Sequence, residues 1–159
     1  MKVPLGPMNN LVDKIRRLRE ESGAPVIRVK KVLEEVGGDE KKALAILQKE
    51  GFEKAEKRAE RATSQGLVTT YSHHSGKIVS VVELLCETDF VARNELFKNL
   101  AHELALQVAS LGAKDAGELV EQEFIKDPSK KVVDLVREVI AKTGENVRVG
   151  RIFRVELGK

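Results

Sequence analysis

The sequence predicts an α+β protein whose helices come first and whose small antiparallel sheet packs against helices in the remainder of the chain. Two patterns predict this. Up to Gly66, apolar residues recur at spacings of three and four, which is typical of amphipathic helices. Beyond Gly66, β-branched residues become frequent and turn sequences divide them into short segments, which is typical of strands.

Three helices are predicted within residues 1–52, and we expect them to form one small module. Asn10 is a candidate N-cap for the first helix. Pro25 suits the first turn of the second helix, and a Gly-Gly-Asp turn then leads into a third helix that ends at Gly51. A bundle of this length lies near the lower size limit for independent folding.

Residues 53–66 predict a connecting helix between the module and the rest of the chain. They favour helix but carry only a thin apolar stripe of Ala55, Ala59 and Ala62. Such a helix would keep its charged faces in water wherever no second domain covers them.

Residues 67–159 are expected to form an α+β core domain. The segments 67–73 and 78–87 predict a β-hairpin, and the second segment is so apolar that we expect both its faces to be covered. Apolar residues recur at four-residue spacing through 91–112, which predicts one long helix.

The C-terminal part of the core is predicted to hold a further helix and a third strand. Ser129 is a candidate N-cap for that helix, and Gly144 is a candidate for its C-terminal end. A sheet of three strands has exposed edges, which pairing with a second copy of the chain would cover. Five apolar residues of the last strand share one parity, which predicts that they lie on one buried face while the other face is exposed to water: Val147, Val149, Phe153, Val155 and Leu157.

The composition indicates a soluble globular protein, with 42% hydrophobic and 33% charged residues. No apolar run approaches the roughly 20 residues of a membrane span, and no signal-peptide segment begins the chain, so we expect a cytoplasmic protein without a membrane partner. The net charge is +3, but acidic and basic residues interleave, which favours solvated helix faces over direct binding of nucleic acid.

Candidate catalytic and metal-binding residues are few. His73 and His74 would point to opposite faces of a strand, so they favour a hairpin turn over a metal site. The single cysteine, Cys86, lies in an apolar segment, which favours a small buried side chain over a catalytic thiolate. No P-loop, G-x-G-x-x-G or G-x-S-x-G sequence occurs, so we expect no bond-making chemistry and no cofactor or metal.

A Thr-Asp-Phe-Val sequence lies where a predicted strand leads into a helix. Thr88 and Asp89 are both good N-cap residues. Phe90 can fold beneath the helix as a staple-like core contact, or it can point outward from a loop tip as an aromatic anchor for a partner. The pattern alone leaves both interpretations open and favours the core contact.

Three segments, in order along the chain, resemble the elongation factor Ts family. LREESGAPVIRVKKVLEEVGGDEKKALAILQKEG is similar to the N-terminal module of that family, with its L-R-x-x-[TS]-G-A opening. ETDFVARNELFKNLA carries the T-D-F-V-A signature, and IAKTGENVRVGR is similar to the G-E-N segment. The matches run from about Leu11 to Leu157, and three collinear motifs are far more specific than one.

The resemblance implies a ubiquitin-associated-like module at 1–52 and a core domain that grips the GTPase elongation factor Tu. It implies a guanine-nucleotide exchange factor that binds the GDP complex, speeds GDP release and is displaced when GTP binds. Four residues would enter the partner near its Mg²⁺ site: Thr88, Asp89, Phe90 and Val91. Three residues of the module would contact the nucleotide domain of the partner: Arg19, Val26 and Ile27.

The chain departs from the family pattern in three ways. Val26 and Ile27 replace a frequent Met-Met pair, which keeps the apolar contact but less of its adaptability. The segment 149–151 retains one arginine of a usual pair. Only one core unit with T-D-F-V is present, and because short bacterial members are homodimers, we expect a homodimer through the sheet or the C-terminal strand, without a disulfide.

Two other hypotheses are open at this point. One is a ubiquitin-associated-like interaction module on an unrelated α+β domain, without exchange activity. The other is a basic protein that binds RNA or the ribosome, in which phosphate-contacting lysines would gather on one face.

Overall fold

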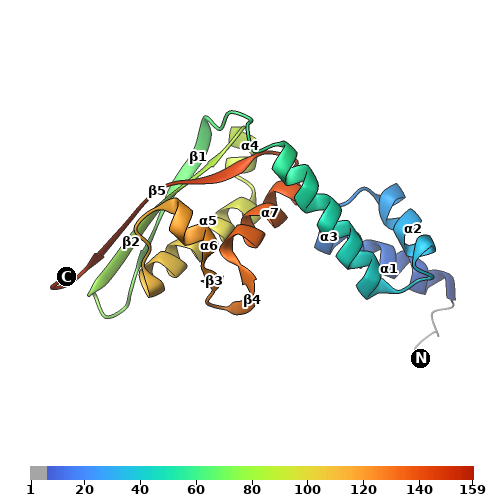
Figure 1. Cartoon of the computed structure of the whole chain (residues 1–159), viewed down its shortest axis with the longest axis horizontal. Coiled ribbons are helices and arrows are strands. Elements are labelled where there is room, and N and C mark those ends of the chain that lie inside the picture. Colours follow the sequence, from blue (N-terminus) through green and yellow to red (C-terminus); the bar gives the residue numbers. More distant parts are fainter. Residues whose placement is uncertain (1–6) are drawn as a thin grey trace, which may run out of the picture.

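The computed structural model describes residues 7–159, with side chains from residue 10 onward, so the first six residues of the expected module lie outside the description. Three helices occupy one end of the elongated molecule, and a sheet with further helices occupies the other (Figure 1). The expected α+β class and the three-stranded antiparallel sheet are confirmed. In the described part of the chain, no helix is long and apolar enough to span a bilayer.

The N-terminal end consists of α1 (Pro7–Ser22), α2 (Val26–Glu35) and α3 (Glu40–Lys57). Asn10 does not cap α1, because the helix already begins at Pro7. Asp39 caps α3, since its side chain accepts a hydrogen bond from the backbone N–H of Lys42 at 3.1 Å. The three helices bury a separate apolar cluster: Leu18, Val29, Val32, Leu33, Ala43 and Leu47.

The expected helix end at Gly51 and the separate connecting helix over 53–66 are both wrong. Helix α3 continues through Gly51 to Lys57, and a loop then leads to β1 (Gln65–Ser72). The glycine has a packing role instead, because a Cβ at this position would lie 3.1 Å from the Cβ of Ala141 on α7 (Val132–Thr143). The absence of a side chain therefore lets the two helices pack closely.

Side chains of α3 and α7 reinforce this contact. The guanidinium of Arg137 lies 5.7 Å from the centre of the Phe52 ring and 3.3 Å from the carboxylate of Glu56. Gly23, in the turn after α1, also lies against α7, since a Cβ there would meet the backbone of Lys142 at 2.8 Å. The three-helix end is thus packed directly against the core domain.

The sheet has the order β1-β2-β5, all antiparallel, with β2 at Ile78–Cys86 and β5 at Val147–Glu156. The predicted hairpin of β1 and β2 is confirmed. Helix α5 (Glu95–Leu111) crosses one face of the sheet, and α7 covers the β5 side of the same face. Val82, Leu84 and Cys86 point into this covered face and are completely buried.

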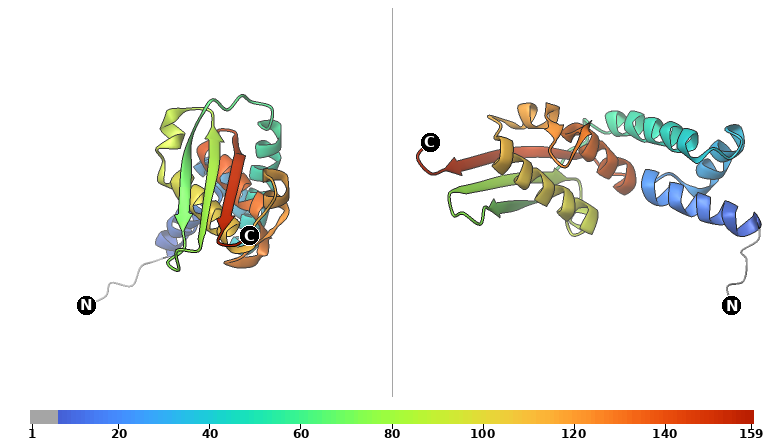
Figure 2. Two further views of the ribbon diagram at one scale, coloured as in Figure 1. Left: turned by 90° about the vertical axis from the view of Figure 1, so that its left-hand side faces the viewer. Right: turned by 90° about the horizontal axis from the view of Figure 1, so that it is seen from below.

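The other face of the sheet is bare, which corrects the expectation that both faces of β2 are covered. The left view of Figure 2 looks onto this face, and no described element lies in front of it. Along β2 the buried residues alternate with more exposed ones, and Val79 on the bare face is 38% exposed. Val68 of β1 lies on the same face and is 64% exposed.

A β-bulge in β5 overturns the predicted parity of the last strand. Val149 pairs with Leu84 and Ile152 pairs with Val82, so the two residues between them lie opposite the single residue Glu83. Val147 and Val149 therefore face the core. Beyond the bulge the apolar residues point outward, at 56%, 68% and 73% exposure for Phe153, Val155 and Leu157 respectively.

The long helix expected over 91–112 is also interrupted. A single turn, α4 (Asp89–Ala92), comes first, and α5 starts after Asn94, whose side chain accepts from the N–H of Leu96 at 2.8 Å. Asn94 is thus a helix cap within the segment, and its cap geometry separates the two helices. Gly112 closes α5 at a positive φ of 69°.

Between α5 and α7 the chain forms α6 (Ala116–Glu121) and a small hairpin, β3 (Glu123–Phe124) with β4 (Asp127–Lys131). The buried amide of Gln107 holds this hairpin, since it donates to the carbonyl of Glu123 and accepts from Ile125. Ser129 does not cap α7. Its hydroxyl donates to Asp127, and the helix begins after Lys131. Gly144 ends α7 at a φ of 77°, as expected.

Candidate functional site

The segment Thr88–Val91, here called the tip, forms the single turn α4 and the residue before it. Thr88 is the N-cap, and its hydroxyl accepts from the N–H of Val91 at 3.4 Å. Asp89 occupies the first turn and pairs with Arg93 at 3.0 Å. Phe90 is 81% exposed whereas Val91 is 8% exposed, so Val91 provides the core contact and Phe90 points outward.

A carboxylate from a distant part of the chain holds the start of the tip. Glu145 accepts the backbone N–H of Thr88 at 2.9 Å and the Thr88 hydroxyl at 2.6 Å. In return, the carboxylate of Glu87 accepts the backbone N–H of Asn146 at 2.6 Å. The two loops are therefore joined by side-chain to backbone bonds in both directions.

Cys86 lies beneath the tip as a buried strand residue, as expected. Its thiol donates to the carbonyl of Thr88 at 3.1 Å. Burial raises the pKa of the Cys86 thiol, and the nearby Glu145 carboxylate raises it further. A thiol with a raised pKa remains protonated near neutral pH and is a poor nucleophile.

The residues predicted on the module lie around the N-terminal end of α2. Arg19 and Val26 line one groove of about 360 Å³, together with Val12, Ile15, Arg16 and Glu20. Ile27 does not line this groove, but its side chain is 84% exposed next to it, and Val26 is 45% exposed. The structure therefore brings two of the three predicted residues into a groove and leaves the third on open surface beside it.

The tip and the module groove share no lining residue, so they are two separate surfaces. Both present exposed apolar side chains, Phe90 on one and Ile27 on the other. Neither surface holds a paired acid and base or a nucleophile with an activating partner. What such surfaces can do is contact another macromolecule.

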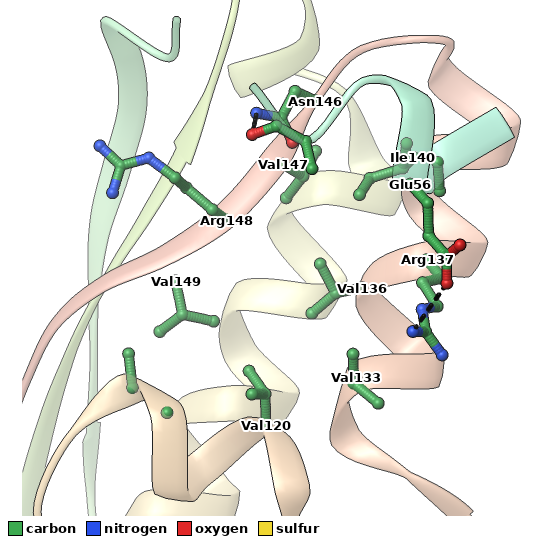
Figure 3. Close-up of a pocket in the computed structure, with 14 residues that line it drawn as sticks. Glu56, Val120, Val133, Val136, Arg137, Ile140, Asn146, Val147, Arg148 and Val149 are labelled. Atoms are coloured by element: carbon green, nitrogen blue, oxygen red, sulfur yellow. Dashed lines mark hydrogen bonds and ion pairs between the residues drawn. The ribbon is translucent and has the colours of Figure 1, made fainter. Parts of the chain in front are cut away.

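An apolar pocket of about 370 Å³ lies between the end of α3, α6, α7 and β5 (Figure 3). Valines dominate its lining, including Val120, Val133, Val136 and Val149 in Figure 3. Its charged side chains are engaged, since Arg137 pairs with Glu56 and Arg148 donates to the hydroxyl of Thr63 at 2.7 Å. This pocket has no arrangement of groups for catalysis.

The histidines lie at the hairpin turn, as predicted, although they do not diverge. His73 follows the last residue of β1, and the rings of His73 and His74 lie with centroids 4.2 Å apart and planes tilted by 36°. The Nδ1 of His73 lies 2.8 Å from the hydroxyl of Ser75. Among residues 10–159, no group of three or more histidine, cysteine or acidic side chains is placed to hold a metal ion.

Sequence reasoning missed the part played by Glu145 and Asn146, which entered only as letters of a motif. The only signal for it was an acid and an amide directly after Gly144.

The structure also shows what surrounds Gly150, the position at which the family motif has its other arginine. At Gly150 in the bulge the Glu83 side chain folds over the backbone and pairs with Arg151 at 2.8 Å, and a Cβ would collide with it.

Comparisons with known proteins give a consistent result. A family model described as elongation factor TS matches residues 87–159. Elongation factor Ts of Thermotoga petrophila is 40% identical over 191 aligned residues, which cover 93% of this chain and 96% of that protein. Elongation factor Ts of Coprothermobacter proteolyticus is 37% identical, covering 91% of this chain and 96% of that protein.

The alignments also indicate that this chain is shorter than these relatives. Since 93% of 159 residues is about 148, about 43 of the 191 aligned positions in the Thermotoga petrophila comparison have no residue in this chain. Elongation factor Ts of Clostridium botulinum is 42% identical over 91% of this chain, which corresponds to only 47% of that protein.

Proposed function

Because the chain belongs to the elongation factor Ts family, we propose that it binds the GDP complex of elongation factor Tu and promotes release of the nucleotide. Members of this family are translation elongation factors, and they act in general as exchange factors for that GTPase. The proposal includes a ubiquitin-associated-like module at 1–52, a core domain at 67–159 and action in the cytoplasm.

The single observation that carries the proposal is the exposure of Phe90. An aromatic side chain that is 81% exposed contributes little to the fold, yet its backbone is ordered by the Thr88 cap and by the buried neighbour Val91. Such a rigid, outward-pointing ring is suited to enter a pocket of a partner. We infer that the tip enters elongation factor Tu near its Mg²⁺ site and displaces the groups that hold the metal and the phosphates.

The energy that this mechanism requires is modest. GDP is held in a GTPase by phosphate contacts and a bridging Mg²⁺. The exchange factor needs only to bind the nucleotide-free partner more tightly than the GDP-bound partner. Linkage then requires that it lower the affinity of the partner for GDP by the same ratio. A 100-fold effect corresponds to about 2.7 kcal/mol. Contacts of one aromatic ring and a few polar groups are of this size, so no bond-making chemistry is needed.

The module supplies a second contact in this proposal. Val26 and Ile27 present exposed apolar surface, and Arg19 lies beside Val26 in the same groove. We infer that this surface binds the nucleotide domain of elongation factor Tu. It would contribute affinity, while the tip would contribute the distortion that releases GDP.

A homodimer through the bare face of the sheet completes the proposal. Phe153 and Val155 of β5 lie on this face beside Val81 and Val79 of β2, and large exposed apolar patches are typical of interfaces. A second copy would bury them and place two tips in one particle. Since the only cysteine is buried, no disulfide would link the copies.

Release of a fluorescent GDP analogue from elongation factor Tu tests the exchange function. The full chain at increasing concentration is expected to accelerate release of the bound analogue when unlabelled GDP or GTP is in excess. If the chain binds elongation factor Tu but does not accelerate release, the result would favour the alternative of an interaction protein without exchange activity. RNA binding with a steep salt dependence and no effect on GDP release would favour the ribosome-binding alternative.

A further inference from the structure

We propose that Glu145 and Asn146 are positioning residues, which hold the tip in its outward orientation and tie it to the loop after α3. The inference rests on the proposed function, because it concerns how the tip is presented to elongation factor Tu. We call these two residues, with their partners Glu87 and Thr88, the clamp.

The first step of the argument is the place of the clamp in the sheet. Strands β2 and β5 end their backbone pairing at Cys86 and Val147. Directly beyond that pair the ladder continues through carboxylates, because Glu87 accepts the N–H of Asn146 and Glu145 accepts the N–H of Thr88. The clamp therefore extends the sheet up to the first residue of the tip.

The second step concerns the cap. The hydroxyl of Thr88 donates to Glu145 at 2.6 Å and accepts the N–H of Val91, which fixes its rotamer from both sides. Hydrogen bonds to an ionised carboxylate are shorter and stronger than those between neutral groups. Removal of Glu145 would leave the Thr88 side chain free to rotate and the cap without support.

The third step connects the tip to the module. Asn146 is only 3% exposed. Its side-chain amide donates to the backbone carbonyls of Ala59 at 3.2 Å and Arg61 at 2.9 Å. These carbonyls belong to the loop that joins α3 to β1. Asn146 thus bonds both to Glu87, directly before the tip, and to the chain leaving the module.

The fourth step is that the tip cannot hold itself. A helix of four residues forms almost no stable structure alone, because nucleation fixes several residues for one hydrogen bond. The Phe90 ring, at 81% exposure, adds little packing that would anchor it. The orientation of Phe90 therefore depends on Val91 below and on the clamp at the N-terminal end of α4.

A tryptophan reporter tests the clamp without relying on exchange activity. The chain contains no tryptophan, so Phe90→Trp places a single indole at the tip. In this background we expect Glu145→Ala to lower the fluorescence anisotropy of the indole, because local motion increases. Glu121→Ala is the matched control, since it also removes a carboxylate, paired with Lys131 at 2.9 Å, but does so on α6. It should leave the anisotropy unchanged.

The second readout uses the native Phe90. Glu145→Ala is expected to lower the maximal rate of stimulated GDP release about tenfold, while the concentration that gives half of this rate changes less than about threefold. Glu145→Gln keeps one acceptor oxygen and should lose less, which provides a milder variant if the alanine variant does not fold. Circular dichroism establishes that each variant is folded.

The outcomes separate the two proposals. An unchanged indole anisotropy in both Glu145 variants, at wild-type helix content, would overturn the clamp even if the wild type accelerates GDP release. Lowered anisotropy with a wild-type rate of release would overturn its positioning role. Failure of the wild type itself to accelerate GDP release from elongation factor Tu would overturn the proposed function, and the anisotropy would still decide whether Glu145 holds the tip.

Discussion

Phe90 and Val91 are neighbours in the chain, but the side chain of Phe90 points into solvent and that of Val91 points into the protein. Phe90 is 81% exposed, whereas Val91 is 8% exposed and packs into the main apolar core. Consecutive residues of a helical turn point about 100° apart, so one turn suffices to separate them. The tip is thereby anchored by one residue and presents the next.

This arrangement predicts that Phe90→Ala separates stability from activity. Little buried area is lost, so the free energy of unfolding should change by less than about 0.5 kcal/mol. Stimulated GDP release from elongation factor Tu should fall at least about tenfold, as expected for loss of an aromatic anchor. Urea unfolding and fluorescent GDP release measure the two effects. Phe97→Ala is the control, because Phe97 is fully buried and its loss should cost about 3–5 kcal/mol.

The module surface predicts an effect on affinity. Ile27→Ala removes an 84% exposed side chain and should weaken binding of elongation factor Tu about 5- to 30-fold, with no loss of thermal stability. Titration calorimetry with nucleotide-free partner measures this. Leu111→Ala, at 59% exposure on the end of α5, should bind normally. Equal affinities for the two variants would contradict a contact at Ile27.

The bare face of the sheet predicts the oligomeric state. Phe153→Glu places a charge among exposed apolar residues and should convert a wild-type dimer into monomers at micromolar concentration, because burial of an unpaired charge is unfavourable. Analytical ultracentrifugation distinguishes the two species. Leu111→Glu introduces the same charge on a different surface and should remain dimeric. A wild type that sediments as a monomer would contradict the proposed dimer.

Close packing at Gly51 predicts a size limit. Gly51→Leu should destabilise the protein by about 1–3 kcal/mol, since the added atoms would force α3 away from Ala141. Gly51→Ala should be close to neutral, because a gain in helix propensity of about 1 kcal/mol opposes the crowding. Glu53→Leu adds a leucine at an exposed position of the same helix and should have little effect. Thermal unfolding compares the three variants.

The ion pair of Arg28 and Glu50 predicts a pH dependence of stability. Hydrogen bonds from the Arg28 guanidinium, at 2.9 Å for Nε, lower the pKa of the Glu50 carboxyl below its ordinary value of 4.5. A depressed folded-state pKa stabilises the protein above the unfolded-state pKa, and this stability is lost as the pH falls through the folded-state pKa.

Glu50→Gln should therefore lower the urea midpoint at pH 7, and the difference from the wild type should shrink steadily below about pH 4.5. Glu20→Gln is the control, because Glu20 pairs with Arg16 in an exposed i,i+4 contact and should have little effect at any pH. A difference that is constant from pH 7 to pH 3 would show that loss of packing, rather than ionisation, explains the Glu50 variant.

Local patterns predicted the architecture well, and long-range packing decided the errors. The hairpin and the three N-terminal helices follow from periodicity, which each segment carries by itself. Local pattern predicts a helix end at Gly51, but this residue is a helical glycine that packs against Ala141, far along the chain. Parity arguments assume one residue per partner, so they do not predict the bulge at Gly150, and they therefore place Phe153 on the wrong face.

The candidate site was predictable only in part. The four tip residues were found through resemblance, since the pattern alone favoured a core position for Phe90. The clamp could not be found in that way, because Thr88 and Glu145 are separated by 57 positions and meet only through the fold. Nothing in the local composition around Glu145 indicates which backbone N–H will donate a hydrogen bond to its carboxylate.

The uninterrupted helix α3 has a consequence for how sequences of this kind can vary. It spans 18 residues, or about 27 Å; its first half packs within the module, and its end leads to the loop that the clamp holds. One residue inserted between Leu47 and Gly51 would rotate the module by about 100° about the helix axis relative to the core domain, whereas seven would nearly restore its phase. Length changes should therefore accumulate in the loops around α6 and be excluded from α3, where helical phase sets the angle between the two exposed surfaces.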